Sequence, residues 1–159
     1  MSLWAALAGG FVGTIVLTSV MRAATALQLT RVDMPFLLGT ALTADRRRAK
    51  VLGYLVHFSF GLLFALIYYG VFVAVDRAGF LLGGLLGFLH ALFAGTTLVG
   101  TLLPAVHPRM AHDLTAADSS PLLETPGFML MNYGRRTPLF MVTAHIVYGV
   151  IVGGFIGLA

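Results

Sequence analysis

Residues 79–106 read GFLLGGLLGFLHALFAGTTLVGTLLPAV and contain no aspartate, glutamate, lysine or arginine. This run is longer than the roughly 20 residues that a helix rising 1.5 Å per residue needs to cross a hydrocarbon core about 30 Å thick. Three further runs have the same character, residues 3–27, 51–75 and 139–158, and only the first is interrupted by a charge, Arg22. The sequence therefore predicts four transmembrane helices.

The composition supports this interpretation for the whole chain of 159 residues. It is 58% hydrophobic and 10% charged, with a mean hydropathy of +0.94. A soluble domain of this size could not bury so much apolar surface. None of the runs shows the strict alternation of a lipid-facing β-strand. We therefore expect an all-α membrane protein, with residues 1–159 forming a single membrane domain.

The positive charges are concentrated in two of the three connections. The net charge is +4 and the isoelectric point is about 10. Most basic residues flank or lie in residues 28–50 and residues 107–138, whereas the short second connection has Arg77 beside Asp76. By the positive-inside rule, both basic connections are cytoplasmic and both termini lie outside. The charge thus reports topology and not nucleic-acid binding, and residues 46–50 are expected to anchor lipid headgroups.

An internal repeat relates the two halves of the chain. The glycines of residues 9–13, GGFVG, recur in residues 83–87, GGLLG, and His57 and Gly61 of residues 57–61 recur as His145 and Gly149 of residues 145–149. Two copies of a two-helix unit have the same orientation in the membrane, so a pseudo-two-fold axis along the membrane normal is expected. Small residues four apart predict close helix packing in a four-helix bundle.

Two short segments beside the basic residues also resemble each other. Residues 34–38 and residues 126–130 each combine proline with apolar side chains, and we expect short interfacial or partly re-entrant helices there. The later of the two basic connections, residues 107–138, is longer than the earlier one and carries His107 and His112 in a turn-rich loop. Histidine is a common metal ligand, so both are metal candidates together with His90, although their spacing matches no metal motif.

His57 and His145 are the polar residues with the clearest functional interpretation. The repeat places them at similar depths in the second and fourth runs, and two imidazoles on facing helices are the usual axial ligands of haem b. Gly61 and Gly149, one turn further along, would leave room for the macrocycle. Two alternatives remain open: another metal ion, or structural hydrogen bonds to neighbouring helices. For His90, which has no partner in the repeat, we expect a hydrogen bond to a polar neighbour such as Thr14 or Thr18.

The chain resembles a broad group of uncharacterised small four-helix membrane proteins of bacteria and archaea. The resemblance is carried by the His-x-x-aromatic-Gly runs, the GGxxG runs and the sequence Arg136-Thr137-Pro138-Leu139. It implies a four-span fold in the inner membrane of a cell. It carries no activity onto particular residues.

Three functional hypotheses follow from these features. The chain has no cysteine, P-loop, nucleotide-binding fingerprint or paired carboxylates inside a run, which favours a protein that is not an enzyme. The first hypothesis is an accessory or assembly subunit that packs against other membrane subunits or against itself. The second is a haem b or metal-binding electron carrier. The third is a small pore or carrier, since internal repeats are common in transporters.

Overall fold

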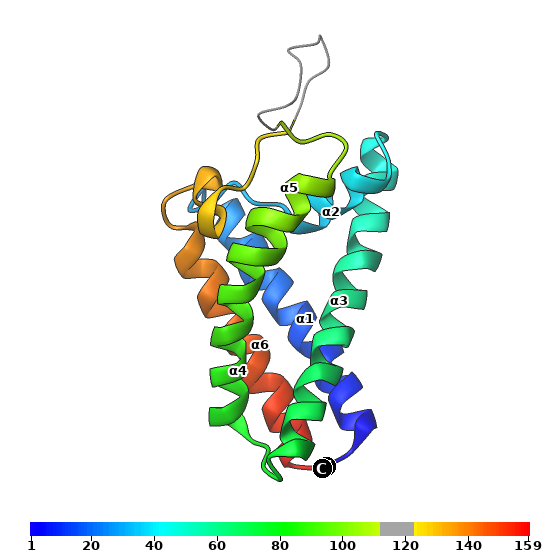
Figure 1. The fold of residues 1–159 in the computed structure, drawn as a ribbon, viewed down its shortest axis with the longest axis vertical. Helices are drawn as coiled ribbons and strands as arrows, with labels where there is room; N and C mark the ends of the chain where they lie inside the picture. Colours follow the sequence, from blue (N-terminus) through cyan, green and yellow to red (C-terminus); the bar gives the residue numbers. More distant parts are fainter. Residues whose placement is uncertain (112–122) are drawn as a thin grey trace.

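The structure is a computed structural model that describes residues 1–111 and 123–159. Within these residues the chain is helical, and the predicted four helices that are long and apolar enough to span a membrane are confirmed (Figure 1). The spans are α1 (Leu3–Ala26), α3 (Arg46–Ala74), a third span made of α4 (Phe80–Phe93), the π-helix η1 (Ala94–Leu102) and α5 (Leu103–Val106), and α6 (Thr137–Gly157). Two short helices, α2 (Met34–Leu42) and the 3-10 helix η2 (Phe128–Tyr133), lie at one end.

Capping residues set where several helices begin. The Asp45 side chain accepts hydrogen bonds from the backbone N–H groups of Arg47 and Arg48, so α3 starts five residues before the predicted position Val51. The Asp33 side chain accepts from Phe36 N in the same way and starts α2. Such caps satisfy donors that have no partner within the helix. Four of the five basic residues of the first connection, all except Arg31, therefore belong to the first turns of a spanning helix.

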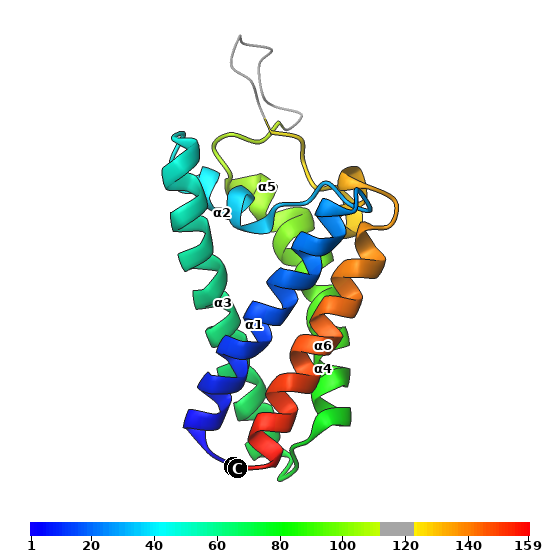
Figure 2. The same cartoon turned by 180° about the vertical axis from the view of Figure 1, so that it is seen from behind.

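The helices pack in the order α3, α1, α6, α4. α1 lies against α3 and α6, α6 lies also against α4, and α2 lies against α3 (Figures 1 and 2). By contrast, α3 and α4 approach each other much less closely. The side of the bundle between α3 and the third span is consequently the least tightly closed.

Glycine contacts bring α4 and α6 together. A Cβ at Gly149 would collide with the carbonyl oxygen of Gly83, and a Cβ at Gly87 would collide with the carbonyl oxygen of His145. In α1 and α3 a similar contact is made by Gly61 against the Thr14 side chain. Because lipid gives helices no hydrophobic reason to associate, close backbone approach of this kind supplies the packing energy.

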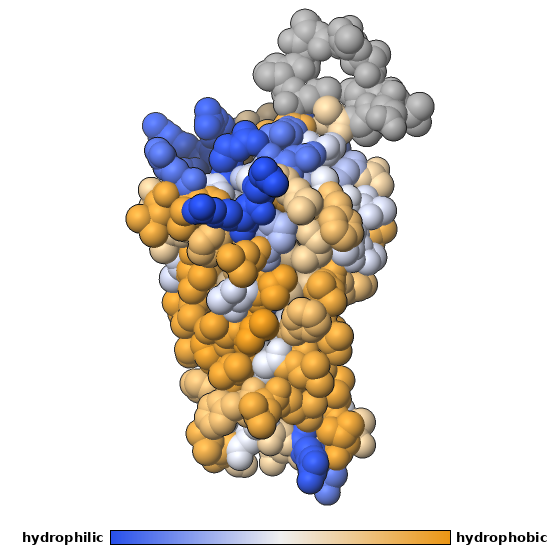
Figure 3. Space-filling model, turned by 90° about the vertical axis from the view of Figure 1, so that its left-hand side faces the viewer, coloured by the Kyte–Doolittle hydropathy of each residue, from blue (hydrophilic) through white to orange (hydrophobic). Residues whose placement is uncertain are grey.

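The surface has the polarity of a membrane protein. Large apolar side chains on the spans face outward, for example Leu81, which is 92% exposed, and Leu139, which is 66% exposed. Figure 3 shows a broad hydrophobic belt, a hydrophilic cap at the end that carries α2, and a small hydrophilic group at the opposite end. Both chain termini lie at that opposite end (Figure 1). We therefore treat the four helices as spanning a lipid bilayer.

The third span is not a regular α-helix. Residues 94–102 form a π-helix, in which the Thr101 hydroxyl donates to the Thr96 carbonyl five residues earlier at 2.9 Å. Pro104, just beyond it, has no N–H to donate and disfavours a regular turn before it. π-Helices of this length are rare and are often found at functional sites. This one borders the cavity described below.

The glycine contact between α4 and α6 can be tested by adding one methyl group. Gly149→Ala should lower the free energy of unfolding by about 1–3 kcal/mol, because the new Cβ meets a backbone carbonyl that cannot move alone. Gly70→Ala, in α3, is the matched control: a Cβ there has nothing within 4 Å, so helix propensity should leave stability unchanged or raise it by up to about 1 kcal/mol. Thermal unfolding in mild detergent measures both. Equal stability of the two variants would contradict the packing.

Candidate functional site

A cavity of about 270 Å³ lies between α3 and the third span. α1 and α6 form its inner wall, and side chains of α2 and η2 border the end nearest the basic cap. Most of the lining is apolar, and no charged side chain takes part. An engineered cavity of roughly 150 Å³ already holds a benzene molecule, so this one has room for a larger organic group. We name it the α3–α4 cavity.

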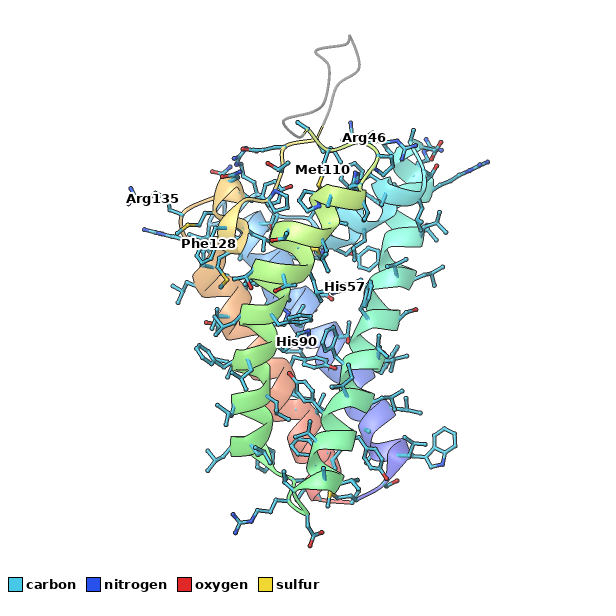
Figure 4. All side chains as sticks on the ribbon, in the orientation of Figure 1. Arg46, His57, His90, Met110, Phe128 and Arg135 are labelled. Carbon is cyan, nitrogen blue, oxygen red and sulfur yellow. The ribbon has the colours of Figure 1, made fainter. Side chains whose placement is uncertain are left out.

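Three histidines from three helices line this cavity: His57 of α3, His90 of α4 and His145 of α6. Figure 4 shows His57 and His90 in the space between α3 and the third span. Polar groups at this depth are costly in lipid unless they are hydrogen-bonded, so their partners determine what each can do.

His57 is held by Thr18 of α1. The Thr18 hydroxyl donates to the Thr14 carbonyl at 2.6 Å, so its oxygen is left to accept. The His57 Nε2–H therefore donates to Thr18 Oγ1, at 3.1 Å. This assigns the proton of the neutral ring to Nε2 and leaves a lone pair on Nδ1.

His145 has the opposite tautomer. Its Nδ1 lies 2.8 Å from the Met141 carbonyl oxygen, one turn earlier in α6, and so must donate the proton. The lone pair of the neutral ring is then on Nε2.

His90 lies among aromatic rings and does not bond to α1. Its ring stacks on Phe64 with centroids 3.7 Å apart, and it meets the His145 ring edge-on at 4.7 Å. Its Nδ1 lies 3.3 Å from the Tyr68 hydroxyl. His90 thus has a polar neighbour, as expected, but this is Tyr68 of α3 and not Thr14 or Thr18 of α1, because Thr18 bonds to His57 and α6 lies between α4 and α1.

The site has more acceptors than donors. In the described part of the chain, His57 Nδ1 and His145 Nε2 have no hydrogen-bond partner, and no side-chain nitrogen or oxygen there is both fully buried and unpaired. Both lone pairs are thus accessible. The Tyr148 hydroxyl donates to the Gly61 carbonyl at 2.5 Å, so its oxygen can also accept. Chemically, the cavity suits an apolar molecule that donates hydrogen bonds.

The residues predicted to hold haem are only partly brought together. His57 and His145 line one cavity, but the ring that contacts His145 is that of His90. Gly61 lines this cavity beside Thr14, whereas Gly149 does not line it and lies in the helix contact against Gly83. Haem ligation by His57 and His145 therefore stays a prediction.

The predicted metal candidates do not form a cluster in the described residues. Residues 1–111 and 123–159 contain no group of three or more histidine, aspartate or glutamate side chains that could hold a metal ion. His107 is buried and satisfied: Nε2 donates to the Leu37 carbonyl at 3.1 Å, and Nδ1 accepts from Arg109 N at 3.1 Å. His112 lies outside the described residues. His107 thus ties the second basic connection to α2.

Sequence reasoning missed the aromatic surroundings of His90. Phe64 and Tyr68 belong to α3, and their four-residue spacing puts them on one helix face. That spacing is a usable signal for a packed face, but it does not tell which histidine the face meets. It also missed Arg22 and Tyr54, whose side chains form a hydrogen bond between α1 and α3.

The burial of His107 makes the stability of the basic end depend on pH. Burial lowers the pKa of His107 below its ordinary value of 6.5; the hydrogen bond to the Leu37 carbonyl opposes this shift, and the nearby Arg109 adds to it. The unfolded chain then binds a proton that the folded chain does not, so stability is full above about pH 6.5 and is lost as the pH falls below it. We expect the melting temperature of the wild type to fall more between about pH 7 and about pH 5 than that of His107→Gln. Parallel pH profiles of the two proteins would contradict this role.

Comparison of the chain with protein families, curated proteins and solved structures gave no match. The functional argument for this protein accordingly rests on its own residues. In the α3–α4 cavity, three histidines of the spanning helices come together with open space. It is the candidate functional site.

Proposed function

We propose that this chain is an accessory protein of a bacterial or archaeal cell membrane that binds a membrane-soluble organic molecule in the α3–α4 cavity. The observation that carries the proposal is the combination of an apolar cavity with free imidazole lone pairs. A bundle whose helices only pack against each other needs neither an apolar cavity nor an unpaired imidazole nitrogen. Polar side chains in such a bundle hydrogen-bond to neighbouring helices.

The chemistry of the lining narrows the class of molecule. No charged side chain lines the cavity, so a charged ligand would be desolvated without a counter-ion. The accessible nitrogens of His57 and His145 are acceptors, which favours a ligand with hydroxyl or N–H donors. We infer a neutral, hydrophobic alcohol, phenol or quinol. Such a molecule would reach the site from the bilayer, between α3 and the third span.

The same proposal includes the topology and the origin of the cavity. The basic end of the bundle is placed in the cytoplasm by the positive-inside rule, with both termini outside. The duplicated two-helix unit is supported by a glycine contact within each pair of helices: Gly61 of α3 lies against α1, and Gly83 of α4 lies against α6. A two-fold axis relating the two units would make the contact of α4 with α3 equivalent to the contact of α1 with α6. Only α1 and α6 pack closely, and the looser contact of α4 with α3 makes room for the cavity.

The accessory role is supported by the apolar surface that remains outside the bundle. Phe80, Leu81 and Leu85 of α4 are each more than half exposed. Lipid can cover this surface, and so can another membrane subunit or a second copy of the chain. Cross-linking in native membranes distinguishes these arrangements, and a protein recovered only as an isolated monomer would count against the accessory role.

A cavity-filling variant tests the site directly. Leu98→Trp should occlude the cavity that Leu98 lines and abolish binding of 1-naphthol, used as a hydrophobic probe with one hydroxyl. Leu89→Trp is the matched control, because Leu89 lies on the same span, is 50% exposed and does not line the cavity. Calorimetric titration in nanodiscs, corrected for partition into empty discs, measures binding.

The role of the imidazoles has its own readout in the same experiment. Wild type should bind 1-naphthol about 2-fold to 10-fold more tightly than naphthalene, as expected for one hydrogen bond, and His145→Phe should remove that difference. Unchanged binding in Leu98→Trp would refute the site, whereas equal affinity for both probes in wild type would refute the donor chemistry.

Haem b is the second candidate, favoured by one observation: His57 and His145 line the same cavity. Protein purified from haem-replete cells should then show a Soret band and sharp reduced α and β bands, all lost in His57→Ala and in His145→Ala. His107→Gln serves as the control, since His107 lies outside the cavity and should leave the spectrum intact. A colourless wild-type protein would dismiss this candidate.

A further inference from the structure

We propose that a second cavity, between α1, α2 and α3, binds the phosphate group of an anionic phospholipid. This cavity also has a volume of about 270 Å³. It lies where α1 and α3 diverge toward α2 (Figure 2). Unlike the α3–α4 cavity, it carries two cations, Arg22 and Lys50, together with the hydroxyl of Tyr54. We name it the headgroup pocket.

Arg22 is the central residue, because its side chain forms no salt bridge with a carboxylate of the described residues. A guanidinium has five N–H donors, and the described residues give Arg22 one partner, the neutral hydroxyl of Tyr54. The ion pair in the described part of the chain is formed elsewhere, between Arg31 and Glu124 at 3.3 Å. An arginine in a spanning helix needs an anion or water for its remaining donors.

Asp33 also lines the pocket but does not neutralise it. Its Oδ1 accepts a hydrogen bond from Phe36 N and caps α2. With Arg22 and Lys50 against Asp33, the lining carries two positive charges and one negative charge. The pocket therefore retains a net positive charge that a phosphate would balance. Arginine suits phosphate through its planar fork of donors, and lysine adds a point charge.

The depth and the inner wall of the pocket favour a lipid over a free ion. Arg22 lies four residues before the end of α1 and Lys50 four residues after the start of α3, or roughly 6 Å from each helix end. This is headgroup depth at the basic end of the bundle. The wall beyond the cations is apolar, formed by Leu17, Met21 and Val32, residues that also line the α3–α4 cavity. An acyl chain can cover this wall, whereas inorganic phosphate cannot.

This inference does not depend on the proposed function. The cations belong only to the headgroup pocket, and Leu98 belongs only to the α3–α4 cavity. Binding of 1-naphthol and binding of a lipid headgroup can therefore succeed or fail separately. His57 lines both cavities, so it is left unchanged in the test.

The test uses the full chain in a neutral detergent, with dihexanoyl phosphatidylglycerol as the probe and native mass spectrometry as the readout. The double variant Arg22→Gln/Lys50→Gln should bind it at least about tenfold more weakly than wild type, because charge-assisted hydrogen bonds are lost. The control Arg135→Gln/Arg136→Gln removes the same charge from two exposed positions just before α6, outside the pocket, and should stay within about twofold of wild type.

One further ligand and the control make the result decisive. Inorganic phosphate should bind far more weakly than the lipid; equal affinity would overturn the assignment to a lipid. An equal loss in the Arg135/Arg136 control would overturn the pocket in favour of diffuse surface attraction. Should the Arg22/Lys50 variant fail to fold, Arg22→Lys and Tyr54→Phe replace it. Each keeps the charge and should still weaken lipid binding, and wild-type affinity in both would overturn the proposal.

Discussion

The close approach of α6 to α4 sets the arrangement of the other helices. In lipid, helices gain little from burying apolar side chains, so contact is strongest where small residues allow backbones to meet. Through Gly149 and Gly153, one face of α6 packs against Gly83 of α4. The neighbouring face, with Tyr148 and Val152, packs against Gly13 and Gly9 of α1. With α6 between them, α1 and α4 stand apart, and α3, which packs on α1, reaches α4 only through side chains.

The hydrogen bonds of the polar side chains in the spans also depend on how few partners a helix has in lipid. Most hydroxyls donate to the carbonyl one turn earlier in their own helix, as Thr14 does to Gly10 at 2.6 Å and Ser59 does to Leu55 at 2.8 Å. A hydroxyl that has donated its proton can still accept, and Thr18 does so from His57. A neutral imidazole that donates from one nitrogen keeps a lone pair on the other. Where the helices do not close, that lone pair faces open space.

The sequence predicts the spans well and the site only in part, for physical reasons. Long uncharged runs have one stable state in a bilayer, so the number of spanning helices could be read from the composition of the runs. The rotation of each helix depends on which neighbour it meets, and a repeat does not specify this. His57 and His145 match in the repeat, yet one bonds across to α1 and the other within its own helix. The π-helix was not predicted because Gly95, Gly100 and Pro104 permit it without requiring it.

The short helix α2 connects the two cavities to the basic end of the molecule. It borders the headgroup pocket through Met34 and Pro35 and the α3–α4 cavity through Met34 and Leu38. Its far end is held by Arg109, whose side chain donates to the Thr40 carbonyl at 2.6 Å, and by His107. Gly39 and Gly53 let it lie directly on α3. A displacement of α2 would therefore change both cavities together, whereas the glycine contacts of α4 with α6 lie outside its reach. The glycine contacts of α4 with α6 thus hold one pair of helices together independently of α2, whereas both candidate binding sites have α2 as part of their wall.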